Sequence, residues 1–146
     1  LDGRYRPAVA PLVDHLSEPA LNRMRTHVEV EWLIHLTDDG VVPGVRRLSD
    51  DEKDRLREVV TTFGPAEIEE LAATEKVTQH DVKAVEYFIA DRLEGLGLGR
   101  LKPLVHFACT SEDINNLAYA VGVRDAVEQV WLPAARAAAT AMTLGT

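Results

Sequence analysis

Cysteine is almost absent from this 146-residue sequence, which contains only Cys109. One cysteine cannot form a disulfide within the chain, and it cannot build a zinc site from several thiolates. The sequence also lacks a run of about 18 apolar residues and a basic start followed by an apolar stretch. We therefore expect neither a membrane span nor a signal peptide, and a reducing cytoplasm as the compartment.

Positive charge is the minority charge. The chain has 16 Lys and Arg against 24 Asp and Glu, a formal net charge of -8 and a pI near 5.1. Such an acidic surface repels phosphates, so we expect neither a nucleic acid nor an anionic membrane as a partner. A small anionic ligand would need a local positive pocket.

What is present suits one soluble, folded unit. Apolar residues make up 46% and charged residues 27% of the chain, and 146 residues can bury a substantial core. No strand-like alternation, internal repeat or low-complexity tract occurs. The sequence therefore predicts an all-α fold.

Proline and glycine divide the first two thirds of the chain into helices. Residues 1–16, with Gly3 and two prolines, predict an extended arm or broken turns. Apolar residues at helical spacing predict a helix over about 19–36 that Ser17 caps, followed by a loop over 37–48. Further helices are expected from Ser49 to about residue 62, from Pro65 to about 76, and from about 81 to the glycine-rich run at 95–99.

The last predicted helix runs from Ser111 toward Gly145 and is interrupted only by Pro133, which we expect to kink it. A helix over 111–144 spans roughly 50 Å, whereas a compact domain of this size is roughly 38 Å across. Its far end should protrude and present apolar surface. We expect further chain or other subunits to cover that surface.

Two segments, residues 78–81 and 110–113, place Thr three residues before Asp at an expected helix start. Free N–H groups at a helix start bind phosphate or carboxylate, and His80, Thr110 and Ser111 add side-chain donors. Both starts could face one anionic ligand. The same pattern also begins many helices for stability alone.

Other candidate residues carry weaker signals. Arg4 and Tyr5 combine a planar guanidinium with a phenol, which suits a phosphate clamp. His106 lies in an apolar neighbourhood that favours a buried histidine with its hydrogen bonds satisfied. Lys83 and Glu86 are three residues apart and can pair on a helix surface. Since no second His or Glu follows His80 at helical spacing, we expect no metal site.

Three strings resemble the adenylosuccinate lyase family, a branch of the fumarase/aspartase superfamily, in order and separation. They are L-D-G-R-Y at 1–5, T-Q-H-D-V-K-A-V-E-Y-F at 78–88 and H-F-A-C-T-S-E-D-I-N-N at 106–116. The similarity spans essentially the whole chain, which covers about the first third of such an enzyme. Gln79 departs from the asparagine that family members often carry, but it retains a side-chain amide.

The resemblance implies an all-α N-terminal domain over 1–110 and the truncated start of a central long-helix domain over 111–146. It implies a homotetramer whose active sites draw segments from three subunits. The reaction is elimination of fumarate from adenylosuccinate, giving AMP, and from succinyl-carboxamide ribotide in purine biosynthesis. No metal or organic cofactor is expected.

Eight positions match the family's substrate-binding motifs: Arg4, Tyr5, Gln79, His80, Asp81, His106, Thr110 and Ser111. By resemblance, Arg4 and Tyr5 contact the nucleotide phosphate, residues 79–81 line the substrate site, and residues 110–111 hold the succinyl end. His106 matches a family histidine near the phosphate.

The family's proton-transferring residues lie in T-H-G-Q and S-S-x-M-P-x-K-x-N segments, and neither string occurs here. We therefore expect no catalytic acid or base in this chain and no activity from the chain alone. Two alternatives stay open. One is another superfamily lyase, such as argininosuccinate lyase or a fumarase; the other is a helical interaction module that catalyses nothing.

Overall fold

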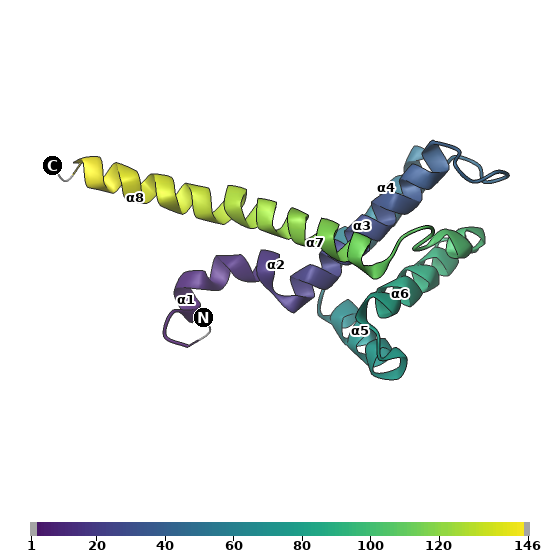
Figure 1. Cartoon of the computed structure of the whole chain (residues 1–146), viewed down its shortest axis with the longest axis horizontal. Helices are drawn as coiled ribbons and strands as arrows, with labels where there is room; N and C mark the ends of the chain where they lie inside the picture. Colours follow the sequence, from purple (N-terminus) through teal and green to yellow (C-terminus); the bar gives the residue numbers. More distant parts are fainter. Residues whose placement is uncertain (1–2, 145–146) are drawn as a thin grey trace.

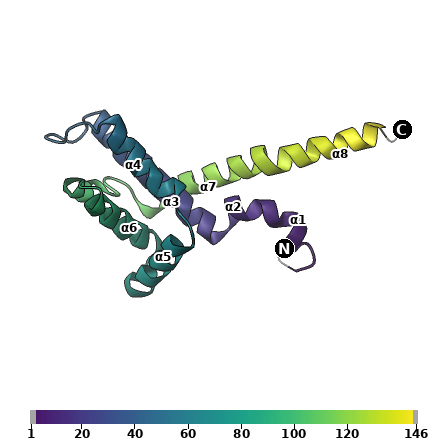
Figure 2. The ribbon, with the colours of Figure 1, turned by 180° about the vertical axis from the view of Figure 1, so that it is seen from behind.

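The computed structural model describes residues 3–144, and every regular element among them is helical. This confirms the all-α prediction. A body of packed helices lies at one end of the molecule, and a long helical rod projects from it (Figure 1). Seen from behind, the N-terminal arm runs from the body in the same general direction as the rod (Figure 2). Leu1 and Asp2 of the first motif, and Gly145 as the expected helix stop, lie outside the described residues.

The N-terminal arm consists of three short helical turns. They are α1 (Arg6–Val9), the 3₁₀ turn η1 (Ala10–Leu12) and α2 (Val13–Leu16). Of the two alternatives from the sequence, broken turns are confirmed and an extended arm is wrong. Pro7 and Pro11 each sit at the start of a turn, where a fixed φ fits but the missing N–H prevents one continuous helix.

The central element is α3 (Glu18–Asp38), which extends the predicted helix by a few residues. Ser17 caps it as expected, because its hydroxyl accepts a hydrogen bond from the Ala20 N–H at 3.2 Å. Buried residues lie on several sides of α3 and include the charged Arg25 and Glu29. The helix is therefore surrounded by the rest of the body.

Three more helices and a 3₁₀ segment complete the body: α4 (Asp50–Thr61), α5 (Pro65–Thr78), α6 (Asp81–Gly95) and η2 (Gly99–Leu104). Helices α4 and α6 pack on α3, and α5 and η2 pack on α6. The bounds of α4, α5 and α6 agree with the sequence predictions to within two residues, whereas η2 was not predicted. Ser49 and Glu52 exchange the two hydrogen bonds of a capping box at the start of α4, with N···O distances of 2.9 and 3.2 Å.

The main core lies between α3, α4, α5, α6 and η2. Its least exposed large side chains, none above 1% exposed, are Leu33, Leu36, Leu56, Ile89, Leu93 and Leu101. Full burial of one such side chain contributes about 1.5–3 kcal/mol. These contacts fix the body as one unit and hold the starts of the later helices in place.

The rod comprises α7 (Ser111–Ala126), a π-helical turn η3 (Val127–Trp131) and α8 (Leu132–Leu144). Only its first part packs on the body, where Ile114 and Ala118 join Met24, Val28 and Val82 in a second buried cluster. Farther along, α2 of the arm packs against α7 near Gly122, and the rest of the rod projects away from the body (Figure 1).

The expected interruption at Pro133 takes the form of the π turn. The Leu132 N–H bonds the carbonyl of Val127, five residues back, immediately before the proline. Pro133 has no N–H, and its ring crowds the carbonyl of Gln129; a wider turn relieves that crowding. The helix therefore continues past the proline into α8.

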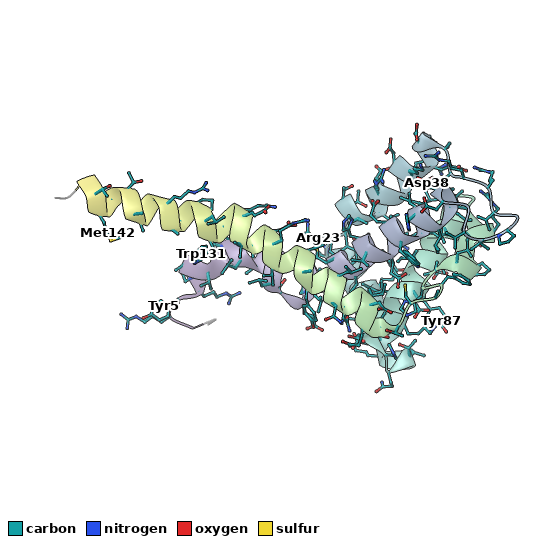
Figure 3. All side chains as sticks on the ribbon, turned by 45° about the horizontal axis from the view of Figure 1, so that its top comes forward. Tyr5, Arg23, Asp38, Tyr87, Trp131 and Met142 are labelled. Carbon is teal, nitrogen blue, oxygen red and sulfur yellow. The ribbon has the colours of Figure 1, made fainter. Side chains whose placement is uncertain are left out.

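The rod carries exposed apolar side chains, as its length led us to expect. Those more than a third exposed are Leu117, Tyr119, Val123, Val127, Trp131 and Met142. Trp131 and Met142 lie on the part of the rod that is remote from the body (Figure 3). Within residues 3–144 much of the apolar surface of these side chains therefore stays in contact with solvent.

Candidate functional site

A polar stripe on α3 organises the candidate site. Arg25, Glu29 and Trp32 are spaced i, i+4 and i+7 and therefore share one face of the helix. Each of them hydrogen-bonds a segment far away in the sequence. The stripe thus connects α3 to the start of α6, the turn over 105–109 and the start of α7.

Arg25 joins the starts of α6 and α7. Its guanidinium is 4% exposed and donates to Asp81 Oδ2 at 2.6 Å from Nη2 and to Asn115 Oδ1 at 2.9 Å from Nε. Asn22, one turn earlier on α3, accepts the third bond at 2.9 Å. Burial raises the pKa of the Asp81 carboxyl, but the Val82 N–H and Arg25 outweigh burial, so that pKa is lowered. Asp81 is therefore an ionised, anchored carboxylate.

The start of α6 differs from the expected Thr cap, and that prediction is wrong. Thr78 is the last residue of α5, and Gln79 reverses the chain with a φ of 54°. His80 caps α6 instead, since its Nδ1 accepts from the Lys83 N–H at 3.1 Å. The connection between α5 and α6 has only two residues, so the cap position falls on His80 and leaves Thr78 in the preceding helix.

The histidine cap at α6 has a chemical consequence. A ring nitrogen that accepts a hydrogen bond carries no proton, so neutral His80 holds its proton on Nε2. The side chain is about half exposed. His80 therefore offers an N–H donor to solvent beside the N-terminus of α6.

The start of α7 follows the sequence prediction. Asp113 Oδ2 accepts from the Thr110 N–H at 2.7 Å and from the Thr110 hydroxyl at 2.9 Å. These two bonds, in that order, lower the pKa of Asp113. The hydroxyl of Ser111 makes no hydrogen bond within residues 3–144. Of the two hydroxyls, Ser111 is thus the one available to a ligand.

His106 is mostly buried and bonded, as its apolar neighbourhood predicted. Its Nδ1 lies 2.5 Å from Glu29 Oε1, and its backbone N–H donates to Glu29 Oε2 at 3.0 Å. Burial raises the pKa of Glu29, while the contacts with His106 oppose that rise. On the far side of the imidazole, Nε2 lies 4.0 Å from Glu86 Oε1.

Lys83 and Glu86 pair on α6, with a separation of 2.6 Å between Nζ and Oε2, as their spacing predicted. The pair raises the pKa of Lys83. Lys83 is thus an ion-paired cation in the first turn of α6.

Arg4 and Tyr5 are not brought to these helix starts. Tyr5 lies in the arm below the rod, whereas Tyr87 on α6 marks the opposite end of the molecule (Figure 3). Arg4 lies over the Tyr5 ring at 5.7 Å from the centroid, and Tyr5 is 60% exposed. Within this chain, therefore, the first motif and the other two form separate surfaces.

An apolar groove of about 550 Å³ runs between α3 and α7. Its lining includes Trp32, Cys109, Leu117 and Val121. Burial raises the pKa of Cys109, which keeps the thiol protonated and disfavours a nucleophilic role. Because of its apolar lining the groove does not suit an anionic substrate.

No group of three His, Cys, Asp or Glu residues able to hold a metal occurs among the residues that the structure describes. Within the same residues no helix has the length and apolarity needed to cross a membrane.

Sequence reasoning missed Arg25 and Glu29. A signal was available: Glu29 sits between two valines in V-E-V at 28–30, and Arg25 directly follows Met24 of the apolar pattern and lies four residues before Glu29. A charge at an inward position must find a buried partner. The identity of that partner is not encoded nearby, since the partners lie 56 to 90 residues away.

Comparison with known proteins shows similarity along almost the whole chain. It is 40% identical to adenylosuccinate lyase of Legionella pneumophila (strain Corby) and 37% identical to that of Escherichia coli (strain K12), each over 134 residues and 91% of this chain. Adenylosuccinate lyase of Dictyostelium discoideum is 34% identical over 136 residues. The chain spans about 29% of the length of these relatives. No protein-family model matches it. The all-α architecture agrees with a fumarase/aspartase-like fold.

Proposed function

Because this chain is a homologue of adenylosuccinate lyases, we propose that it supplies substrate-binding segments to a lyase that eliminates fumarate from adenylosuccinate, giving AMP. The same site would act on succinyl-carboxamide ribotide in purine biosynthesis. The setting of this chemistry is cytoplasmic. Under this proposal residues 1–110 form the substrate-binding N-terminal domain, and residues from 111 onward belong to a central domain of long helices.

The observation that carries the proposal is the polar stripe on α3. Arg25 bonds both Asp81 at the start of α6 and Asn115 in the first turn of α7, and Glu29 bonds His106. Asp81 of the second motif lies 25 positions or more before His106 and Asn115 of the third, yet one helix anchors all three. Such anchoring is what a preorganised binding surface requires.

The two helix starts suit the chemistry of this elimination. A base removes a proton beside a carboxylate, negative charge develops on that carboxylate, and an acid protonates the departing nitrogen. Ser111 and the N–H groups of the first turn of α7 would hold the succinyl carboxylate, with Thr110 shaping the turn. Gln79, His80 and Asp81 would line the other side. Arg4 and Tyr5 would bind the phosphate in a neighbouring subunit's site.

The proton-transferring residues would come from other segments, because the family's T-H-G-Q and S-S-x-M-P strings do not occur in these 146 residues. A homotetramer would bring the segments together, and the exposed apolar face of the rod supports such packing. We therefore expect the purified chain alone to form no AMP from adenylosuccinate.

A second candidate function rests on the same apolar face. A helical interaction module that catalyses nothing would also expose Trp131 and its neighbours for a partner. Another superfamily lyase, such as argininosuccinate lyase or a fumarase, is disfavoured because the relatives described above are adenylosuccinate lyases. A chimaeric enzyme separates these functions.

The test uses a chimaera in which this chain replaces the aligned 134 residues of the Escherichia coli relative. The chimaera should consume adenylosuccinate, whereas the chain alone should not. Ser111→Ala should lower kcat by about tenfold or more, since it removes a donor near developing charge. Arg4→Ala should mainly raise KM. AMP formation by the chain alone would contradict the proposal that the active site needs segments from outside this chain.

Two matched variants separate chemistry from folding. His80→Asn keeps a side-chain cap at α6 but removes the imidazole, so it should reduce kcat/KM without lowering the unfolding midpoint. Thr61→Ala removes an exposed hydroxyl on α4 and should leave kinetics unchanged. An inactive chimaera that assembles with native helicity would favour the interaction module.

A further inference from the structure

Glu29 is a buried carboxylate whose hydrogen bonds, among residues 3–144, all involve His106. Its side chain is 0% exposed, and both oxygens are used by His106. Oε1 lies 2.5 Å from Nδ1, and Oε2 accepts the backbone N–H at 3.0 Å. An isolated buried carboxylate is strongly unfavourable, so this pairing must be specific.

The short contact requires a proton between Glu29 and Nδ1. Imidazole is ordinarily a stronger base than carboxylate, because the reference pKa is about 6.5 for a histidine side chain and about 4.3 for a glutamate side chain. The proton between them therefore belongs on nitrogen. The backbone N–H bond to Oε2 further favours the carboxylate form of Glu29. In neutral His106, Nδ1 then carries the proton and Nε2 carries the lone pair.

The second nitrogen faces outward. Nε2 has no hydrogen bond within residues 3–144. Every side-chain N or O atom that is buried from solvent in those residues does have a hydrogen-bond partner. Nε2 therefore reaches solvent, with Glu86 Oε1 4.0 Å away. His106 is thus anchored on one edge and accessible on the other.

The backbone around His106 is held as firmly as the ring. His106 and Ala108 have φ values of 61° and 59°, a conformation that costs energy for residues other than glycine. Glu29 binds the N–H of His106, and the Trp32 indole N–H donates to the Phe107 carbonyl at 2.9 Å. Two side chains of α3 therefore pin adjacent parts of this strained turn.

Charges reach His106 from each packed element. Glu29 comes from α3, Glu86 and Lys83 come from α6, and Asp113 comes from α7. Lys83 binds Glu86 at 2.6 Å and Asp113 is occupied by Thr110, so Glu29 is the carboxylate bonded to the ring.

We propose that Glu29 is a positioning residue for His106, which fixes the Nδ1–H tautomer and presents Nε2 to the substrate. Neutral Nε2 accepts a proton or a hydrogen bond. Protonated Nε2 becomes a cationic donor for an anionic oxygen, with Glu29 as its buried counter-charge. The substrate part of this inference rests on the proposed function, whereas the tautomer does not.

His80 supplies an internal contrast. Its Nδ1 accepts from the Lys83 N–H, which leaves the proton on Nε2. The two histidines of the candidate site should therefore be opposite tautomers in one molecule.

Nitrogen-15 NMR of the 146-residue chain measures the tautomers directly, above the pH at which imidazole ionises. We expect a protonated Nδ1 for His106 and a protonated Nε2 for His80. A protonated Nε2 in neutral His106 overturns the inference whatever any variant does. This readout needs neither substrate nor catalysis.

Two variants test the role of Glu29 in the same spectra. In Glu29→Gln the amide oxygen can accept the backbone N–H while the amide N–H₂ donates to Nδ1, so the His106 tautomer should reverse. Glu86→Gln should leave it unchanged; reversal in both variants, or in neither, contradicts the assignment to Glu29. If Glu29→Gln does not fold, Glu29→Asp retains the carboxylate and should retain the tautomer.

Kinetics of the chimaera complete the test. Glu29→Gln should lower kcat/KM by about tenfold or more, and Glu29→Asp should recover part of that loss. The expected tautomers together with an inactive chimaera would refute the proposed function and leave the Glu29 inference standing. A His106 that carries its proton on Nε2 in an active chimaera would refute the Glu29 inference and leave the proposed function standing.

Discussion

The body around α3 and the far half of the rod differ in the solvent exposure of their side chains. In the body, large apolar residues such as Leu33 are about 1% exposed, and the buried charges Arg25 and Glu29 have partners. On the rod, Trp131 is 61% and Met142 69% exposed. The contrast is visible in Figure 1, where the rod leaves the body soon after α7 begins. The body therefore buries its own apolar side chains, whereas the rod leaves large apolar side chains exposed within residues 3–144.

The candidate site lies where these two regions meet. The start of α7 belongs to the body through Ile114 and Asn115, but its continuation belongs to the rod. The start of α7 is therefore anchored in the core, and the same helix continues into the exposed rod. Arg4 and Tyr5 lie apart from this junction, in the N-terminal arm.

The largest expected effect sets a core leucine against the exposed tryptophan. Leu33→Ala should lower the free energy of unfolding by about 2–5 kcal/mol, because it leaves a cavity in the core. Trp131→Ala should change it by less than about 0.5 kcal/mol in the chain alone. Urea unfolding followed by circular dichroism measures both. A large loss of unfolding free energy in Trp131→Ala would mean that the rod surface around Trp131 is already buried in the chain alone.

An intermediate effect concerns the contact between the arm and the rod. A Cβ at Gly122 would lie 2.9 Å from the His15 carbonyl oxygen, so Gly122→Ala should destabilise by about 1–3 kcal/mol and release α2 from α7. Hydrogen exchange over residues 6–16 should rise. Gly95→Ala is the matched control, since nothing lies within 4 Å of its Cβ position. That variant should be neutral or slightly stabilising. Unchanged exchange in Gly122→Ala would show that the arm does not depend on this contact.

The smallest expected effect is a difference between two carboxylates of the body in how their contributions to folding stability depend on pH. The pKa of buried Glu29 is raised above 4.5, so its contribution to stability is present below pH 4.5 and is lost as pH rises through the folded value. Glu52, held by Arg46 and the Ser49 N–H, has its pKa lowered from 4.5 to about 2. Its contribution is present above pH 4.5 and is lost as pH falls toward 2.

Urea unfolding of three proteins between pH 2 and 8 measures this contrast. The stability of the natural chain relative to Glu29→Gln should decline above pH 4.5. Its stability relative to Glu52→Gln should instead rise between pH 2 and 4.5. If the relative stability changed with pH in the same direction for both variants, burial would not control the pKa of Glu29.

The helices of this protein were predictable because their signals are local. Ser17 and Ser49 cap α3 and α4 as their positions indicate, and Asp113 closes the first turn of α7 over Thr110. The same T-x-x-D pattern misled at Thr78, because a two-residue connection moved the cap to His80. A local pattern therefore located both helix starts but identified the capping residue in only one.

The sequence by itself determined the helices, the all-α class, the motifs and the protruding apolar rod, because spacing and composition act over a few residues. Only the tertiary structure decided that Arg25 joins two helix starts and that Glu29 anchors His106. Those bonds connect residues 56 to 90 positions apart, and a charge is tolerated in the interior only where folding delivers its partner. The separation of Arg4 and Tyr5 from the other motifs was likewise set by packing, since their order in the chain does not determine their distance in space.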